Sequence, residues 1–239
     1  MANIQSVFER EETKYIITRS QYHDLVKALG DHIEPDIYFK NTNCSVYYDT
    51  PEFELVSRSL DKPLYKQKIR VRSYGVPKDD TSPVFLEIKK KFKGVGNKRR
   101  LALRLKDFYG FLQHGELYGD SPQIEREIKQ CFDFYNLSPS MYVAYERYSY
   151  CGVKDSDFRL TFDLDLRSRI HDLRLEAGSH GDLFFPDQKV IMEAKGLGAF
   201  PLWFVRELSA MQIRPSSFQK YGYSFQRRFS EIVNNNKRS

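Results

Sequence analysis

The chain has 239 residues with 41% hydrophobic content, enough for one sizeable core or two small ones, and its formal net charge of +6 favours acidic partners. Three scattered cysteines without a CxxC spacing argue against a disulfide or zinc framework. The sequence has no apolar run of membrane-spanning length and no signal-peptide pattern, so we expect a cytoplasmic, soluble protein without a membrane span.

The predicted elements alternate between strands and helices. Strands are predicted where apolar and polar residues alternate, and helices where apolar residues recur every three or four positions behind a capping residue or a proline. In chain order we predict strand 6–18, helix 20–31, strand 43–50, helix 51–60, strands 66–74 and 84–92, helices 104–115 and 122–135, strands 141–152, 158–169 and 189–196, and helices 201–212 and 216–229.

Charged residues occupy every second position of several predicted strands. Because side chains two apart on a strand share one face, each of these strands has a charged stripe opposite an apolar one. The stripes consist of Lys66, Lys68, Arg70 and Arg72 on one strand, Glu87, Lys89 and Lys91 on the next, and Arg159, Asp163, Asp165 and Arg167 on a later one.

Two interpretations account for these stripes. An antiparallel sheet with one face in water also alternates apolar and charged residues. However, the four successive cations from Lys66 to Arg72 repel one another on such a face, and recurrence of the pattern favours a shared cause. We therefore predict an α+β fold, in which an antiparallel β-barrel forms a tunnel with a charged, basic lumen and helices surround it, as a single domain over residues 1–239.

The sequence lacks the motifs of several enzyme classes. It contains no GxxxxGK[ST], HExxH or GxSxG motif, and its five histidines are isolated. Many cations with a few acids fit phosphoryl transfer, in which catalysis consists mainly of positioning and charge neutralisation. On spacing alone Glu193 has two interpretations, as a ligand of a divalent metal and as the salt-bridge partner of a lysine or arginine.

An ordered set of short motifs resembles a known family. The motifs are E-x-K-Y at 12–15, K-I-R-V-R at 68–72, E-I-K-K-K at 87–91, K-R-R at 98–100, Y-x-R at 145–147, F-R-L-T-F-D at 158–163, M-E-A-K at 192–195 and S-F-Q-K-Y at 217–221. In this order they resemble the VTC domain, a polyphosphate polymerase domain that belongs with the CYTH-like triphosphate tunnel metalloenzymes. The resemblance implies an antiparallel barrel around a basic tunnel, in agreement with the architecture predicted above.

The resemblance also implies an activity, a cofactor and site residues. The activity is synthesis of inorganic polyphosphate from ATP with a divalent metal, Mn²⁺ or Mg²⁺. The residues implied to bind the triphosphate and the growing chain are Lys14, Arg70, Arg72, Lys89, Arg147, Arg159 and Lys220, with Tyr145, Lys195, Arg100 and Gln219 as further substrate-binding residues and Glu193 as the metal ligand.

Two positions depart from the family patterns. Gln219 stands where the family has a small hydroxyl residue, which alters one phosphate contact. Arg10 stands where the hydrolytic relatives have the first acid of an E-x-E-x-K cluster. Fewer acids mean fewer metals, which argues against efficient hydrolysis by a metal-activated water.

Two other functions use the same cations, namely a tunnel triphosphatase and a non-catalytic binder of polyphosphate. Nucleic acid is not an expected partner, because the basic positions alternate with isoleucine and valine rather than with aromatic residues on which bases could stack. We also expect Arg70→Ala to leave stability unchanged or to raise it, because the substitution relieves repulsion between like charges.

Overall fold

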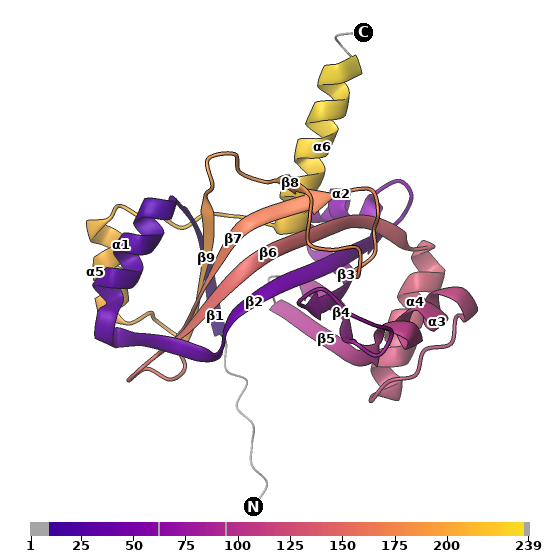
Figure 1. The fold of residues 1–239 in the computed structure, drawn as a ribbon, viewed down its shortest axis with the longest axis horizontal. Coiled ribbons are helices and arrows are strands. Elements are labelled where there is room, and N and C mark those ends of the chain that lie inside the picture. The colour runs from indigo at the N-terminus through magenta and orange to yellow at the C-terminus, as the bar shows by residue number, and fades with distance from the viewer. Residues whose placement is uncertain (1–9, 62, 94, 237–239) are drawn as a thin grey trace, which may run out of the picture. The chain divides into compact units, whose positions relative to one another are not determined.

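The computed structural model describes residues 10–61, 63–93 and 95–236 (Figure 1). Its strands are β1 (Arg10–Ile17), β2 (Ile33–Asp49), β3 (Tyr65–Tyr74), β4 (Pro83–Phe92), β5 (Val95–Arg104), β6 (Ser138–Gly152), β7 (Arg159–Arg169), β8 (Asp182–Leu183) and β9 (Val190–Leu197). Its helices are α1 (Arg19–Leu29), a 3₁₀ turn (Gly30–His32), α2 (Glu54–Leu60), α3 (Leu105–His114), α4 (Pro122–Tyr135), α5 (Leu202–Ala210) and α6 (Lys220–Asn236). The fold is therefore α+β, as predicted.

The described strands pair in the order β1-β9-β7-β6-β2-β3-β4-β5, and β8 pairs with β7. The prediction of a closed barrel is wrong for the described strands. Strands β1 and β5 lie at the two ends of the sheet and are not paired with each other, so the sheet does not close. Alternation along a strand identifies its two faces. It does not say whether the first and last strands meet, since closure depends on strand tilt and stagger.

The described chain falls into two compact units. Unit 1 contains residues 10–41, 146–165 and 185–218, and unit 2 contains residues 42–145, 166–184 and 219–236. Strands β2, β6 and β7 each contribute residues to both units. The expectation of a single domain over residues 1–239 stays a prediction.

Unit 1 contains an antiparallel array of β1, β9 and β7, with α1 and α5 in contact with each other (Figure 1). A capping box starts α1, in which Thr18 Oγ1 accepts a hydrogen bond from the backbone N–H of Gln21 at 3.1 Å, and Gln21 Oε1 accepts one from the N–H of Thr18 at 3.0 Å. The apolar stripes of the strands and helices form one core, which includes Leu25, Leu29, Phe162, Met192 and Phe204.

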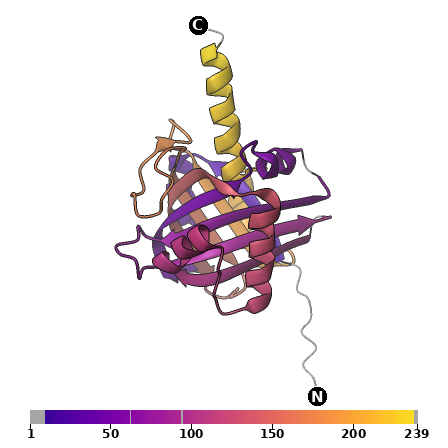
Figure 2. The same cartoon turned by 90° about the vertical axis from the view of Figure 1, so that its right-hand side faces the viewer.

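Unit 2 contains the antiparallel ladder of β3, β4 and β5 with α3 and α4 over one face, which Figure 2 shows with the two helices in front of the strands. The apolar stripe of each strand packs under these helices. The core there includes Ile69, Val71, Leu86, Ile88, Leu101, Phe108, Phe111 and Ile128. The charged stripes therefore lie on the opposite face of β3 and β4, as the alternation predicts.

Two strands differ from the prediction: β5 was not predicted, and β2 was predicted too short. Strand β5 starts with V-G-N-K-R-R, which lacks alternation and has two glycine or asparagine residues that are rare in strands. It forms because it pairs with β4 along ten residues, from Phe92 opposite Val95 to Pro83 opposite Arg104. Strand β2 begins at Ile33 rather than at residue 43, and its first ten residues are largely exposed.

The carboxylate of Asp49 caps α2. The first helical residue of α2 follows Phe53, which has a left-handed backbone (φ 59°) and no capping side chain. Asp49 is fully buried and accepts hydrogen bonds from the N–H groups of Leu55 and Val56 at 2.8 and 3.0 Å, and from the hydroxyl of Tyr221 at 2.7 Å. Burial raises the pKa of Asp49 more than these hydrogen bonds lower it.

Asp49→Ala should lower the free energy of unfolding by about 2–3 kcal/mol, because it leaves the buried N–H groups of Leu55 and Val56 without their side-chain acceptor. Chemical denaturation would measure the change. Glu52→Ala, at an exposed position on the same turn, is the control and should change stability little. Equal effects of the two substitutions would contradict the assignment of Asp49 as the cap.

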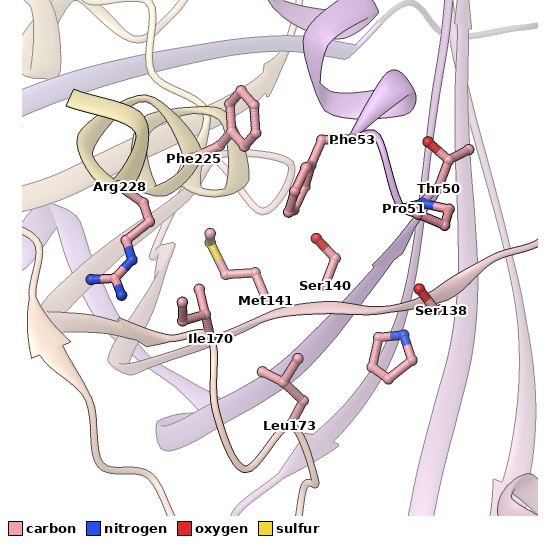
Figure 3. Close-up of a pocket in the computed structure, with 11 residues that line it drawn as sticks. Thr50, Pro51, Phe53, Ser138, Ser140, Met141, Ile170, Leu173, Phe225 and Arg228 are labelled. Carbon is pink, nitrogen blue, oxygen red and sulfur yellow. The ribbon is translucent and has the colours of Figure 1, made fainter. Parts of the chain in front are cut away.

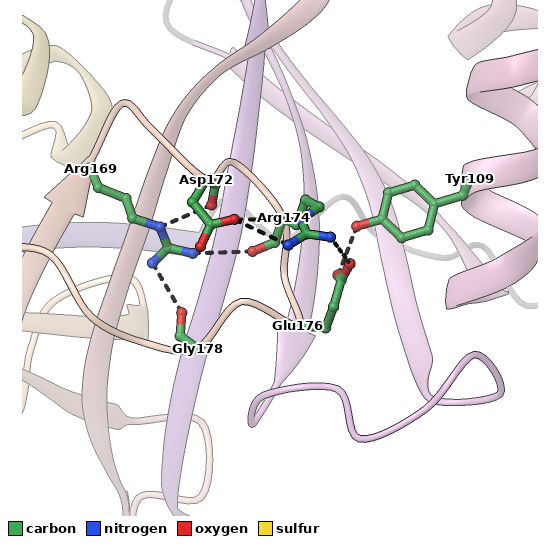
Figure 4. A network of polar contacts seen from close by, with 6 residues as sticks. All are labelled: Tyr109, Arg169, Asp172, Arg174, Glu176 and Gly178. Carbon is green, nitrogen blue, oxygen red and sulfur yellow. Dashed lines mark hydrogen bonds and ion pairs between the residues drawn. The ribbon is translucent and has the colours of Figure 1, made fainter.

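The segment between β7 and β8 folds around Arg169 (Figure 4). The guanidinium donates to the carbonyl oxygens of Asp172, Arg174, Gly178 and His180 at 3.0, 3.1, 3.0 and 2.7 Å. It also lies 3.5 Å from the centroid of the Tyr142 ring on β6. One arginine thus satisfies four carbonyl groups of a segment that has little regular structure.

No helix among residues 10–61, 63–93 and 95–236 has the length and apolar character needed to cross a membrane. The expected cytoplasmic location stays a prediction.

Candidate functional site

The charged face of unit 2 is built by β2, β3, β4 and β5. The strand register places Tyr47 opposite Arg70, Arg70 opposite Glu87, and Glu87 opposite Arg100, so one cross-strand row carries these four side chains. A neighbouring row places Lys68 opposite Lys89 and Lys89 opposite Lys98. We call this surface the basic face of unit 2, defined by Lys68, Arg70, Arg72, Glu87, Lys89, Lys98 and Arg100.

Glu87 is the centre of the basic face and is 2% exposed. Its Oε2 accepts from Nε of Arg70 at 2.7 Å, and its Oε1 lies 2.5 Å from Nζ of Lys98. Burial alone would raise the pKa of Glu87, but the attraction of Arg70, Arg72 and Lys98 outweighs burial and lowers the pKa to about 2. A carboxylate therefore holds two of the cations in fixed positions.

Arg70 forms an ion pair with Glu87, and this changes the expected effect of Arg70→Ala on stability. Its guanidinium also donates to the hydroxyl of Tyr47 at 3.1 Å. Arg70→Ala would leave a buried Glu87 carboxylate without its main partner, so stability should fall rather than stay unchanged or rise. The expectation from the sequence rested on repulsion between cations of one strand, whereas the register places an acid directly across from the arginine.

Three predicted site residues, Arg72, Tyr145 and Lys220, lie close together in unit 2. Arg72 is 6% exposed and donates to the hydroxyls of Ser45 and Tyr145 at 3.1 and 3.0 Å. The ammonium group of Lys220, at the start of α6, lies 4.6 Å from the centroid of the Tyr145 ring. This group combines two cations with a phenol that is buried at 3% exposure.

The remaining predicted residues of unit 2 also lie on or beside the basic face. Gln219 Oε1 accepts from Nζ of Lys68 at 2.5 Å and from the hydroxyl of Ser59 at 3.1 Å. The amide therefore orients a lysine, which a small hydroxyl residue could do less well because it is shorter. Arg100 lies over the ring of Phe85, with 4.8 Å between the guanidinium carbon and the ring centroid.

Unit 1 carries a second cluster, which we call the mixed-charge face of unit 1. It is defined by Glu12, Lys14, Arg147, Arg159, Asp163, Glu193 and Lys195. The register of β1 and β9 places Lys14 opposite Glu193 and Glu12 opposite Lys195. The register of β7 and β9 places Arg159 opposite Lys195. Acid faces base between β1 and β9, whereas two bases face each other between β9 and β7.

The ammonium group of Lys195 lies between two carboxylates. Its Nζ is 2.8 Å from Oε1 of Glu193 and 3.5 Å from Oε2 of Glu12, while Lys14 Nζ lies 3.3 Å from the other oxygen of Glu12. Burial would lower the pKa of Lys195, but the attraction of Glu193 and Glu12 outweighs burial and raises it. Glu193 therefore forms a salt bridge with Lys195 in this structure, which is one of the two roles that its spacing predicts.

The same two carboxylates also fit a divalent metal. Mg²⁺ is commonly bound by one or two carboxylates together with the phosphates of a substrate, and Mn²⁺ accepts similar oxygen ligands. Glu193 and Glu12 direct oxygens at one cation, Lys195, so a metal could be held beside them. Within the described residues, no group of three or more His, Cys, Asp and Glu side chains could hold a metal ion.

Arg147 and Arg159 differ in how firmly they are held. Arg147 makes a two-pronged ion pair with the fully buried Asp163, with distances of 2.6 and 2.8 Å. Arg159 is 60% exposed in its side chain and lies 3.7 Å from Asp36. The first is fixed by a buried carboxylate, and the second is largely in water.

Glu87 and Asp163 lie on the predicted charged stripes and Glu12 lies in a motif, but none of the three was a predicted site residue. Each one contacts a predicted cation across a strand pair. Their signal was present, since Glu87 and Asp163 occupy stripe positions. An acid that interrupts a basic stripe is a candidate for an ion pair with the neighbouring strand.

A separate pocket of about 300 Å³ lies in unit 2 between α6 and the start of β6 (Figure 3). Phe53 and Phe225 lie on one side of it with 5.2 Å between their ring centroids, and Met141 and Ile170 lie near them. The pocket is lined by none of the predicted site residues. We therefore assign it no part in the chemistry that follows.

Comparison with known proteins identifies the family. The family model of the VTC domain matches residues 9–229 of the chain. The chain belongs to the VTC domain family. The sequence resemblance to this family is thus confirmed over nearly the whole length.

Two curated relatives of this VTC domain are both named vacuolar transporter chaperone complex subunit 4. The protein from Trypanosoma cruzi is 27% identical in an alignment of 215 positions, and the match covers 71% of this chain and 26% of the relative. The protein from Trypanosoma brucei brucei is 30% identical in an alignment of 216 positions, and the match covers 71% of this chain and 27% of the relative. The chain therefore spans about a quarter of the length of these relatives.

One similar solved structure is a candidate adenylate cyclase from Bacillus halodurans. It is 12% identical, covers 88% of this chain and 95% of its own chain, and has a TM-score of 0.54. At this identity the likeness concerns the fold alone.

Proposed function

We propose that this VTC domain is a polyphosphate polymerase that transfers the γ-phosphate of ATP to the end of an inorganic polyphosphate chain. A terminal phosphate oxygen of the chain attacks the γ-phosphorus, the bond to the β-phosphate oxygen breaks, and ADP leaves. The observation that carries the proposal is the pair of charged faces, in which buried carboxylates fix arginines and lysines. Membership of the VTC domain family supports the same activity.

The cations of each face can bind phosphate oxygens and reduce their negative charge. Arg72 and Lys220 lie beside Tyr145, whose oxygen accepts from Arg72 and whose O–H can donate to a phosphate oxygen. Arg147, held by Asp163, adds positive charge. Further positive charge comes from Lys14, Arg70, Lys89 and Arg159. Lys68, whose ammonium group donates to the amide oxygen of Gln219, contributes positive charge as well.

A general base is not required in this reaction. The attacking phosphate oxygen is already ionised at neutral pH, so the protein need only orient it and reduce its repulsion from ATP. When bound near Glu193 and Glu12, Mn²⁺ or Mg²⁺ would supply Lewis-acid neutralisation of the phosphate oxygens. The chain's own residues hold the substrates.

The direct test is incubation of the purified chain with ATP and Mn²⁺, and in parallel with Mg²⁺. Products are separated on a gel stained for polyphosphate, while ADP and free phosphate are measured. A ladder of chains with matching ADP is the expected result. Free phosphate without chains would replace the proposal with a triphosphatase, and no turnover with retained binding of tripolyphosphate would replace it with a non-catalytic binder.

Tripolyphosphate should raise the melting temperature by about 5–10 °C at a concentration 100 times its dissociation constant in low salt. Binding to the folded state alone stabilises it by mass action, and salt screens the attraction between phosphate and the two faces. The shift should therefore shrink as sodium chloride is raised to 0.5 M. A shift that is absent, or that is independent of salt, would contradict phosphate binding by these cations.

A further inference from the structure

A second, larger pocket lies on the face of β3 opposite the basic face of unit 2. Gln67 alternates with Lys66 and Lys68 along the strand, so its side chain points to the other side, toward α4. The pocket has a volume of about 660 Å³, within the range of small-molecule sites. It is lined by Tyr65, Gln67, Lys90, Glu127, Gln130, Cys131, Asp133, Phe134 and Tyr135.

The amide of Gln67 offers a buried hydrogen-bond donor to this pocket. The residue is 4% exposed, and its Oε1 accepts from the hydroxyl of Tyr65 at 2.8 Å and from the thiol of Cys131 at 4.0 Å. Its Nε2 is buried and has no hydrogen-bond partner among the described residues. A buried donor without an acceptor is costly, so an acceptor on a ligand would recover that free energy.

Aromatic side chains also line this pocket. Phe134 is 80% exposed and Tyr65 is 44% exposed, although both have large apolar rings. The rings of Phe134 and Tyr135 meet edge to face, with 4.7 Å between their centroids. Exposed aromatic rings beside a cavity provide faces against which a flat ligand ring can stack.

The charges at the pocket do not favour a phosphate. Lys90 and Arg99 both contact the carboxylate of Glu127, at 2.5 and 2.9 Å. Asp133 adds a second carboxylate to the lining, so the charges of these two cations and two carboxylates sum to zero. The carboxylates of Glu127 and Asp133 can instead accept hydrogen bonds from an amino group.

We propose that this pocket binds an uncharged nitrogen heterocycle of the nucleobase class, separately from the phosphate-binding faces. A ring nitrogen of the ligand accepts from Nε2 of Gln67, and its ring stacks on the aromatic side chains. An exocyclic amino group donates to one of the two carboxylates. No part of the proposed polymerase reaction uses this pocket, so the inference goes beyond that function.

Adenosine is the probe, because it carries the base without any phosphate. Isothermal titration of the full chain should show binding of adenosine but not of ribose. Gln67→Met keeps the approximate size of the side chain and removes its donor, and it should weaken adenosine binding at least tenfold. Gln113→Met, the same substitution at an exposed position on α3, should leave binding unchanged.

Two further measurements separate this pocket from the phosphate sites. Saturating tripolyphosphate should leave adenosine binding unchanged, and Gln67→Met should leave tripolyphosphate binding unchanged. Phe134→Ala, at an exposed position, should also weaken adenosine binding and serves as the second variant if Gln67→Met fails to fold. Absence of adenosine binding at millimolar concentration, competition by tripolyphosphate, or full binding by both variants would overturn the proposal. None of these readouts depends on polymerase activity.

Discussion

Glu87→Gln is expected to lower the free energy of unfolding by about 3–5 kcal/mol, the typical effect of breaking a buried ion pair by removing one partner. Glu87 is 2% exposed and contacts Arg70 and Lys98, with Arg72 close enough to influence its pKa. Neutral glutamine leaves these cations close together without a compensating charge. Denaturant titration by fluorescence or circular dichroism would measure the loss.

A matched control is Glu54→Gln, which removes an exposed ion pair with Arg58 within one helix. That substitution should cost no more than about 0.5 kcal/mol. If Glu87→Gln were as mild as Glu54→Gln, the carboxylate of Glu87 would not be what holds the cations of the basic face together.

The same residue predicts a pH dependence of stability. The pKa of Glu87 is about 2 in the folded protein, below its ordinary value of 4.5. Because the folded-state pKa is depressed, the contribution of Glu87 to stability is fully present above about pH 4.5 and is lost as the pH falls toward 2. The difference in stability between the wild-type protein and Glu87→Gln should therefore narrow over this interval. A constant difference would show that the ionisation of Glu87 does not contribute.

Glu193→Gln is expected to reduce the rate of polyphosphate synthesis on the order of 100-fold while tripolyphosphate still binds. The substitution keeps the size of the side chain and removes the charge that would hold the metal beside Glu12. The concentration of Mn²⁺ needed for half the maximal rate should rise. Titration of Mn²⁺ in the gel assay and in the ADP assay would measure this change.

Glu11→Gln is the matched control for this prediction, because Glu11 is exposed and lies on the opposite face of β1 from Glu12. Its activity and Mn²⁺ requirement should equal those of the wild-type protein. If Glu193→Gln lowered the melting temperature but left the Mn²⁺ requirement unchanged, Glu193 would act only as the partner of Lys195.

The sequence predicted which face of each strand carries the charges, and the structure confirms this for β3 and β4, whose apolar residues pack in the core of unit 2. It could not predict what those charges contact, because the contacts depend on the register between strands. Arg70 illustrates the difference. Its neighbours along the strand are cations, but its neighbour across the strand is Glu87.

Strand β5 shows a second limit of the sequence. Its first half has no apolar stripe, and its residues are a strand only because β4 supplies hydrogen-bond partners along its whole length. Long-range pairing thus overrides weak local preference. The same limit explains why the open sheet was not predicted. No local pattern says whether two distant strands such as β1 and β5 pair with each other.

The ion pair of Arg70 has a consequence for the entropy of binding. A long, flexible side chain in water loses rotamer freedom when it grips a ligand, and this loss weakens binding. Two nitrogens of the Arg70 guanidinium already contact Glu87, and the third donates to Tyr47. The freedom of this side chain is therefore lost when the chain folds, and an arriving phosphate meets a guanidinium that is already immobile. Such a group can exchange one phosphate for the next without being ordered anew at each step, which suits the proposed extension of a phosphate chain.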